Sequence, residues 1–289
     1  IKGEKFDALA MTEPGAGSDV RGMKCFAKKD GEDFIINGTK HFISHANIAD
    51  FVIVFIATGE EETPKGMKKL IKDTGVIIFE DPYLGDVINK ISYDQIYDEH
   101  VFLFSALSVS YLFNLHGMEL IDLYPQTTHG GSMRYVLAKN GAYKTSERVR
   151  EIIEIEKSQG LGDLNKLKNF AKIVKKSKND LVTLLKELKN KGKSIAGYAA
   201  TSKSTTIFNY CKINTDLLDY ICDTTPLKQG KLSPGMHIPI LSHNEFRENP
   251  PDYALLLAWN HSEEILSKEK DFINGGGRWI THVPEVRIL

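Results

Sequence analysis

A chain of 289 residues is long enough for two domains, each with its own hydrophobic core. Hydrophobic residues make up 42% and charged residues 26%, and the formal net charge is −1, which is typical of a globular protein and disfavours nucleic-acid binding through an overall basic surface. No apolar run reaches the roughly 18 residues that span a bilayer. The chain opens at Ile1 without a signal-peptide pattern, so we expect a cytoplasmic protein, here a piece of a longer reading frame.

The three cysteines, Cys25, Cys211 and Cys222, lie far apart, and none belongs to a C-x-x-C pair. This spacing disfavours a zinc site and a disulfide framework. The sequence therefore predicts three buried, unreactive thiols and no metal centre.

Residues 1–68 predict a small β-rich domain. Short alternating runs are separated by glycine and aspartate turns, and the clearest runs are Phe34–Asn37, His41–Ser44 and Asp50–Ile56. Asn37-Gly38 between two such runs is a strong hairpin signal.

Residues 69–192 predict an α+β and helical segment. The expected elements are a strand over 75–80, helices over 83–89 and 101–115, a strand over 133–138, and two amphipathic helices that begin after Ser146 and Asp163. The second of these helices carries a lysine-rich face. That face is most simply solvated, and the alternative is a phosphate-attracting surface.

Residues 193–289 alternate between strand and helix. The expected order is strand 194–199, helix 204–210, strand 218–222, strand 252–259, helix 261–270 and strand 278–283. This alternation predicts an α/β domain with a Rossmann-like, mainly parallel sheet.

Two motifs near the start carry a family resemblance. They are Thr12-Glu13-Pro14-Gly15-Ala16-Gly17-Ser18-Asp19 and Asn37-Gly38-Thr39-Lys40-His41-Phe42-Ile43-Ser44. By composition alone they predict a turn-rich hairpin. The run 8–67, however, resembles the middle β-domain of acyl-CoA dehydrogenases. The resemblance implies that the flavin of FAD would contact Met11, Thr12, Ser18, Phe42 and Ser44.

This first resemblance is partial. The family has a tryptophan where Phe42 stands, and His45-Ala46 replaces its usual Asn-Gly pair. The match stops about halfway through the β-domain, before the helical bundle that supplies the family's catalytic glutamate. We therefore do not expect this chain alone to oxidise an acyl-CoA.

Five later motifs carry a second resemblance, to nucleotide-sugar C-methyltransferases over residues 70–289. They are Lys69–Leu84, Tyr93–His100, His129–Arg134, Gly197–Lys203 and Lys228–Gly235, in the family's order and spacing. Methylating a carbon next to a ketone needs a base for the α-proton and donors for the enolate. Tyr97, Glu99 and His100 offer a phenol, a carboxylate and an imidazole within four residues.

Taken alone, such a cluster is more often a hydrogen-bonded structural group. The resemblance implies instead that His100 is the catalytic base and Tyr97 its companion, with Glu99 as a supporting carboxylate. Asp98 stands where many members carry a histidine, which indicates a different sugar.

The turn after strand 194–199 is the predicted substrate-binding element. Gly197-Tyr198-Ala199-Ala200-Thr201-Ser202 is a degenerate phosphate-binding turn, and a plain strand–helix turn is the alternative. The residues expected to hold a nucleotide-diphosphate sugar are Thr201, Ser202, Lys203, Ser204, Asp223 (as the ribose-binding acid) and Lys228, with Asn260 and Glu263 as weaker candidates.

The family implies S-adenosylmethionine as the methyl donor, yet this sequence shows no glycine-rich loop that would hold it. We therefore expect a sugar C-methyltransferase-like chain that is inactive alone. The alternatives are a nucleotide-sugar binding module whose donor domain comes from a partner chain, and a flavin-dependent remnant. The expected assembly is with such a partner chain or as a homo-oligomer. A further alternative is a recombination artefact joined near residues 67–70, without evolved activity.

Overall fold

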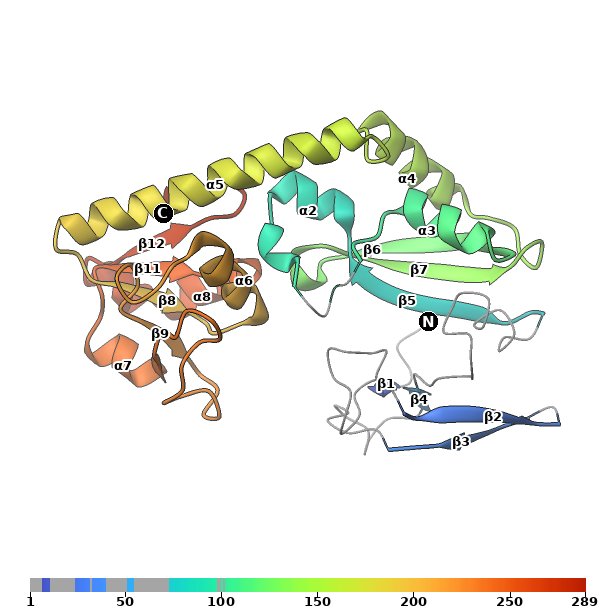
Figure 1. The fold of residues 1–289 in the computed structure, drawn as a ribbon, viewed down its shortest axis with the longest axis horizontal. Coiled ribbons are helices and arrows are strands. Elements are labelled where there is room, and N and C mark those ends of the chain that lie inside the picture. The colour runs from blue at the N-terminus through green and yellow to red at the C-terminus, as the bar shows by residue number, and fades with distance from the viewer. Residues whose placement is uncertain are drawn as a thin grey trace. The chain divides into compact units, whose positions relative to one another are not determined.

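The computed structural model describes residues 7–10, 24–31, 33–39, 51–54, 73–97, 100 and 102–289 (Figure 1). The chain divides into two compact units. The smaller comprises residues 1–77, 111–119 and 137–144, and the larger comprises 78–110, 120–136 and 145–289. None of the described helices is long and apolar enough to cross a membrane.

The elements described before residue 73 are four short strands: β1 (Asp7–Ala10), β2 (Phe26–Asp30), β3 (Asp33–Asn37) and β4 (Phe51–Val54). β1 pairs with β4 in parallel, and β2 pairs with β3 in antiparallel orientation. The described hairpin thus turns after Asp30, which pairs with Asp33, and Gly31 follows with a φ of 61°. The hairpin predicted at Asn37-Gly38 has its second arm, residues 41–43, outside the described residues.

A three-stranded sheet has the order β5-β7-β6. Its strands are β5 (Val76–Pro82), β6 (Met118–Gln126) and β7 (Ser132–Lys139). Between them lie α2 (Leu84–Lys90), the 3-10 turn η2 (Tyr93–Gln95), α3 (Ala106–Asn114) and the 3-10 turn η3 (Thr128–Gly130).

Two differences from the sequence prediction concern this region. β6 was not predicted, and its buried positions do not alternate strictly, which hides the strand period. The single buried helix expected over 101–115 is wrong in extent, because α3 begins only at Ala106 and its residue Tyr111 is 70% exposed.

Two helices lead to the second sheet: α4 (Glu147–Ser158) and α5 (Leu164–Asn190). Asp163 caps α5 as predicted, since its carboxylate accepts a hydrogen bond from the Asn165 amide at 2.8 Å. Ser146 occupies the N-cap position of α4, but its hydroxyl donates to Asp122 at 2.7 Å instead of capping the helix.

The six-stranded sheet of the larger unit has the order β10-β9-β8-β11-β12-β13. Every pair is parallel except β12 with β13. Its elements are β8 (Ile195–Tyr198), α6 (Ser202–Cys211), β9 (Tyr220–Asp223), β10 (Ile240–Ser242), α7 (His243–Glu248), β11 (Tyr253–Leu256), the 3-10 turn η4 (Trp259–His261), α8 (Ser262–Lys268), α9 (Lys270–Asn274), β12 (Arg278–Thr281) and β13 (Arg287–Ile288). The structure is therefore mixed α/β.

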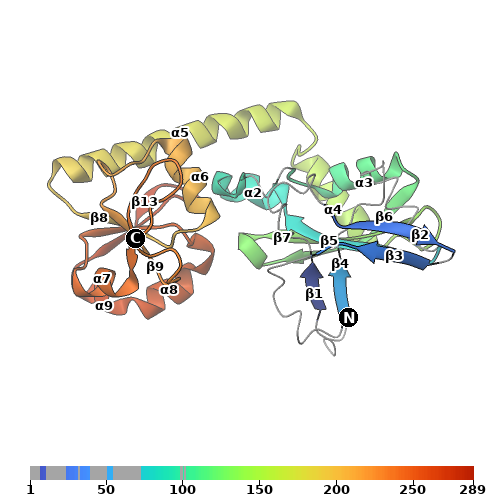
Figure 2. The same cartoon turned by 60° about the horizontal axis from the view of Figure 1, so that its bottom comes forward.

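Helices cover both faces of this sheet (Figure 2). Ile195, Leu255 and Ile280 point to one face and pack against α5 and α6, whereas their strand neighbours Ala254 and Trp279 point to the other face and pack against α7, α8 and α9. Because both faces are covered, the two central strands β8 and β11 carry no charged residue and are largely buried, as expected for parallel strands. Cys211 and Cys222 are buried in these two cores, and Cys25 is also buried, as predicted.

The predicted strand over 252–259 is too long. β11 stops at Leu256, and Trp259 opens the turn η4. The apolar run continues past the end of the strand, so composition alone did not mark the boundary. The result is that Trp259 lies beyond the carboxyl end of the sheet.

Candidate active site

His100 is held between a carboxylate and a phenol. Its Nδ1 lies 3.0 Å from Asp81 Oδ1, and its Nε2 lies 2.9 Å from the Tyr97 hydroxyl. The Asp81 carboxylate can only accept, so Nδ1 carries the proton and Nε2 presents a lone pair, to which Tyr97 donates. The side chains of His100 and Asp81 keep exposures of 16% and 21%, so a ligand can reach them.

Asp81 was missed as a site residue in the sequence, although it ends strand β5. The chain after Asp81 and the chain after His100 are joined by a parallel bridge between Tyr83 and Phe104, and the Leu84 amide donates to the Phe104 carbonyl at 2.9 Å. This pairing brings Asp81 to His100, nineteen positions away in the sequence.

A buried carboxylate, Glu156, anchors the chain segments that adjoin this site. Glu156 of α4 is 0% exposed and accepts from the Tyr83 hydroxyl at 3.0 Å and from the amides of Ala106 and Leu107 at 2.7 and 2.8 Å. It thereby satisfies the first amides of α3, which lack partners within the helix. The loop that carries His100 is therefore anchored immediately after it ends.

Several predicted residues cannot be compared with the structure. Glu99 and the flavin-contacting candidates lie outside the described residues. These candidates are Met11, Thr12, Ser18, Phe42 and Ser44.

The predicted phosphate-binding turn joins β8 to α6. Thr201 is the N-cap of α6, and its hydroxyl accepts from the Ser204 amide at 3.1 Å. The Ser204 hydroxyl donates to the Thr201 carbonyl at 2.6 Å, so it supports the turn from a buried position, whereas Ser202 is exposed. Ala199, in the same turn, has a φ of 79°, which non-glycine residues rarely adopt.

Asp223 ends β9 beside this turn and ties it together. Its carboxylate accepts from the amides of Ala200 and Thr225 at 2.7 and 2.8 Å and from Lys228 Nζ at 3.3 Å. Burial alone would raise the pKa of Asp223, but the bonds from Thr225, Ala200 and Lys228 hold it below the usual 3.8. A ribose hydroxyl would have to replace one of these bonds.

Lys203 lies inside the protein rather than on the surface. It is 6% exposed, and its Nζ donates to the His129 carbonyl at 3.2 Å and to Asn260 Oδ1 at 3.1 Å. Burial lowers the pKa of Lys203, and the Asp94 carboxylate acts in the opposite direction. The structure thus gathers all six predicted substrate-binding residues at the carboxyl edge of β8 and β9, but it does not leave them equally accessible.

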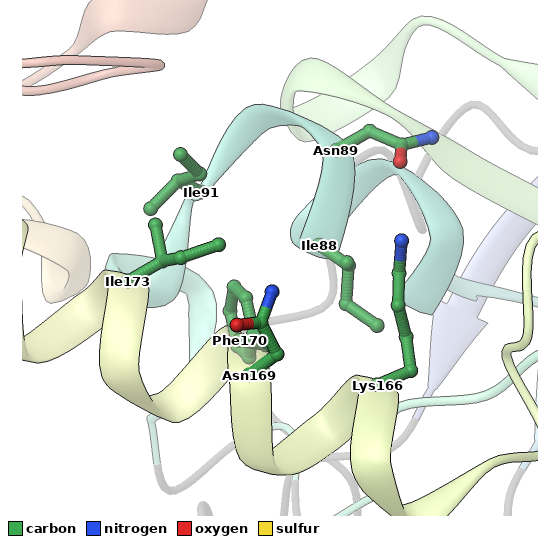
Figure 3. A pocket seen from close by; sticks show the side chains of 7 residues that line it. All are labelled: Ile88, Asn89, Ile91, Lys166, Asn169, Phe170 and Ile173. Carbon is green, nitrogen blue, oxygen red and sulfur yellow. The ribbon is translucent and has the colours of Figure 1, made fainter.

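A cavity of about 210 Å³ lies elsewhere in the larger unit, between α2 and α5 (Figure 3). Ile88 and Ile91 line it from α2, and Phe170 and Ile173 line it from α5. It contains no predicted site residue. Over the ranges that the structure describes, no cluster of histidine, cysteine and carboxylate side chains is suited to a metal ion.

Comparison with known proteins agrees with the two resemblances. Residues 127–284 match the C-methyltransferase C-terminal domain, and residues 8–79 match the middle domain of acyl-CoA dehydrogenases. The first match covers more than half of the chain, and we conclude that the chain belongs to the C-methyltransferase family by its C-terminal domain.

Among individual relatives, the C-methyltransferase NovU of Streptomyces niveus is 34% identical over 229 residues, 79% of this chain and 54% of that protein. The long-chain specific acyl-CoA dehydrogenase of Sus scrofa mitochondria is 39% identical over 102 residues, 27% of this chain and 24% of that enzyme. The 3-(aryl)acrylate reductase of Clostridium sporogenes is 45% identical over 74 residues, 26% of this chain and 20% of the reductase. The chain therefore spans about half the length of NovU and a quarter or less of the other two relatives.

The methyltransferase family implies S-adenosylmethionine, and the acyl-CoA dehydrogenase segment hints at FAD. The N-terminus of α6 favours anionic groups such as a phosphate. We assign the donor no site among the described residues.

Proposed function

We propose that the larger unit binds a nucleotide-linked keto sugar and removes the proton from the carbon next to its ketone. This is the step that makes such a carbon nucleophilic enough to accept a methyl group. The observation that carries the proposal is His100 held between Asp81 and Tyr97, with both contacts at hydrogen-bond distance. The resemblance assigned catalytic roles to His100 and Tyr97 as well. Asp81 joins them as the carboxylate that orients the imidazole, and Glu99 lies outside the described residues.

In this mechanism His100 Nε2 takes the α-proton, and the C–H electron pair moves into the carbon–carbon bond of an enolate. The imidazolium that forms is stabilised by Asp81, which accepts from Nδ1. The Tyr97 hydroxyl leaves Nε2 and donates to the enolate oxygen instead. A positioned base of this kind contributes about 10²–10⁴ in rate.

We further propose that the six-stranded sheet is Rossmann-like and that its β8–α6 turn holds the diphosphate. The exposed Ser202 and the first amides of α6 are the donors, while Thr201 and Asp223 hold the turn in shape. The proposal also includes the three domains predicted from the sequence, which are residues 1–68, 69–192 and 193–289. NovU, by its name a C-methyltransferase, supports the reaction class, and the keto sugar is our inference.

Methyl transfer itself needs the donor, and we infer that this stretch of chain does not complete the reaction without a donor-binding segment or partner. The proposed role of the chain is therefore sugar binding and activation. If His100 does not act as a base, the chain would be a nucleotide-sugar binding module, which binds the sugar without activating it.

Calorimetric titration with thymidine diphosphate, guanosine diphosphate and S-adenosylmethionine tests the binding. We expect one of the diphosphates to bind and S-adenosylmethionine not to bind. Thr201→Ala should weaken the nucleotide by about 1 kcal/mol, roughly fivefold in Kd, because the turn loses its cap.

The matched control is Ser242→Ala, which removes the cap of α7, where Ser242 accepts from the Glu245 amide at 3.3 Å. It should lower stability similarly but leave nucleotide affinity unchanged. Absence of diphosphate binding, or equal weakening by both variants, would refute the proposed phosphate site.

A further inference from the structure

A second polar cluster lies where the His100 segment meets the carboxyl edge of the six-stranded sheet. Trp259 Nε1 donates to Asp94 Oδ2 at 2.7 Å, across 165 positions of sequence. His282, which follows β12, places its Nε2 3.4 Å from the same oxygen. Asp94 and His282 are both 0% exposed, so this cluster is closed to ligands.

The same indole also meets the turn η3. A Cβ on Gly130 would lie 2.2 Å from the Trp259 ring, and Gly130 has a φ of 87°, so this position requires glycine. Lys203 Nζ stands 4.9 Å from the centre of the Trp259 ring while it donates to the His129 carbonyl. Trp259 therefore contacts η2 through Asp94, η3 through Gly130, and the start of α6 through Lys203.

These contacts of Asp94 with Trp259 and His282, called the joint below, are electrostatically unfavourable. Asp94 Oδ1 and both ring nitrogens of His282 have no hydrogen-bond partner among the described residues, and a buried carboxylate with few partners is destabilising. An apolar contact would hold the two parts together without that cost. What the indole–carboxylate bond adds is a fixed direction, because its donor and acceptor have one mutual geometry.

The direction matters because of where Asp94 lies. It belongs to η2, three residues before Tyr97, and η2 is itself closed by a bond from the Gln95 side chain to the buried Ser92 hydroxyl at 3.1 Å. Tyr97 is in turn bonded to His100, because the His100 amide donates to the Tyr97 carbonyl at 2.9 Å. A shift of η2 therefore carries Tyr97 and His100 with it, while Asp81 stays on β5.

We propose that Asp94 and Trp259 are positioning residues that set Tyr97 and His100 against Asp81. Lys203 connects the same joint to the β8–α6 turn. Trp259 therefore contacts both the proposed nucleotide-binding turn and the segment that carries the proposed base. This inference rests on the proposed function for the role of His100 as a base, but the placement of His100 can be measured without it.

The test compares Trp259→Phe with Trp279→Phe, the same substitution at the other tryptophan of the chain. Trp279 is 1% exposed and its indole N–H has no described hydrogen-bond partner, so its change removes core volume without removing a bond. Two properties are measured on each folded variant. The first is the pair of His100 ring nitrogen shifts by NMR. The second is the rate at which the α-proton of a thymidine diphosphate-linked 4-keto hexose exchanges in deuterated water.

We expect Trp259→Phe to move the two His100 nitrogen shifts toward each other, because the Asp81 and Tyr97 contacts loosen. It should lower kcat for exchange about 100-fold, the effect of a misplacement near 1 Å, with KM unchanged. Trp279→Phe should lower the melting temperature and leave both His100 readouts as in the parent. The proposal is overturned if the two variants act alike on His100, or if neither changes it.

A second pair of variants covers the case in which Trp259→Phe does not fold. Asp94→Asn keeps an acceptor for the indole N–H and should retain most of the exchange rate, whereas Asp94→Leu removes the acceptor and should match the loss expected for Trp259→Phe. Equal behaviour of the two Asp94 variants would overturn the proposal. If the parent shows no exchange while its His100 shifts respond to the joint, the proposed function fails and the positioning role stands.

Discussion

Two aspartate–histidine pairs in the larger unit differ in burial more than in geometry. Asp81 and His100 are 3.0 Å apart and partly exposed, whereas Asp94 and His282 are 3.4 Å apart and fully buried. The exposed pair has a third partner, the Tyr97 hydroxyl, on the nitrogen that faces away from the carboxylate. The presence of an aspartate beside a histidine therefore does not by itself indicate a catalytic base. We propose His100 as the base because its side chain is partly exposed and because the Tyr97 hydroxyl lies on its second ring nitrogen.

The two pairs also depend on different parts of the fold. Asp81 meets His100 through the pairing of two neighbouring chain segments after β5 and before α3. Asp94 meets His282 and Trp259 only because the C-terminal sheet is in place. In our proposal the local Asp81–His100 structure is held in register by the remote contact of Asp94 with Trp259.

The largest expected effect comes from Asp81→Asn, which removes the carboxylate of the partly exposed Asp81–His100 pair. The amide does not stabilise an imidazolium and no longer fixes the proton on Nδ1, so α-proton exchange should fall at least about 100-fold. The measurement is deuterium incorporation into the keto sugar.

The matched control is the neighbouring residue, Glu80→Gln, whose carboxylate bonds Ser132 and Arg134 instead of His100. It should leave the exchange rate near that of the parent. An exchange rate that survives Asp81→Asn would remove Asp81 from the mechanism.

A second prediction separates carboxylates that stabilise the fold from those that act in the reaction. Glu156→Gln should lower the free energy of unfolding by about 2 kcal/mol, because the buried bonds to the Ala106 and Leu107 amides lose their charge. Urea denaturation followed by circular dichroism measures this. The control is Glu154→Gln, an exposed residue on the same helix paired only with Lys157, for which we expect a change within about 0.5 kcal/mol. Equal effects of the two substitutions would contradict the assigned role of Glu156.

A third histidine–carboxylate pair, on the other face of the sheet, predicts how the stability of the protein depends on pH. His243 Nε2 lies 3.0 Å from Glu269 Oε1. Burial lowers the pKa of His243 below the usual 6.5 although Glu269 opposes this. The pKa of Glu269 also lies below its usual 4.5, because bonds from Arg247 outweigh the effect of burial.

Both shifts make the unfolded chain bind more protons than the folded one, so stability should fall as the pH decreases from about 6.5, and fall further below about 4.5. His243→Gln should flatten the upper part of this dependence. Unfolding free energies measured at about pH 7 and about pH 5.5 in both proteins test the prediction. A parent protein whose stability rises as the pH is lowered through this range would contradict it.

Much of the C-terminal region followed from local chemistry. The β8–α6 turn was predicted because a strand, a run of capping residues and a helix adjoin in sequence, and Thr201 caps the helix as expected. The long helix after Asp163 followed in the same way from its cap and its apolar period.

The residues that were missed act over long sequence separations. Asp81 reaches His100 only after the Tyr83–Phe104 bridge forms, and nothing near Asp81 in sequence indicates its partner. Trp259 was assigned to a strand because the apolar run of β11 continues to it, although the strand ends at Leu256. The joint that Trp259 makes with Asp94 depends on the packing of parts that the sequence order does not bring together.

Deuterium exchange at the carbon next to the ketone, with His100→Ala beside the parent chain and no methyl donor present, tests the central claim most directly. The account predicts exchange by the parent, and a loss of at least about 100-fold in the variant while nucleotide binding persists. Exchange at the same rate in both proteins, or none by a parent that binds the sugar, would contradict it.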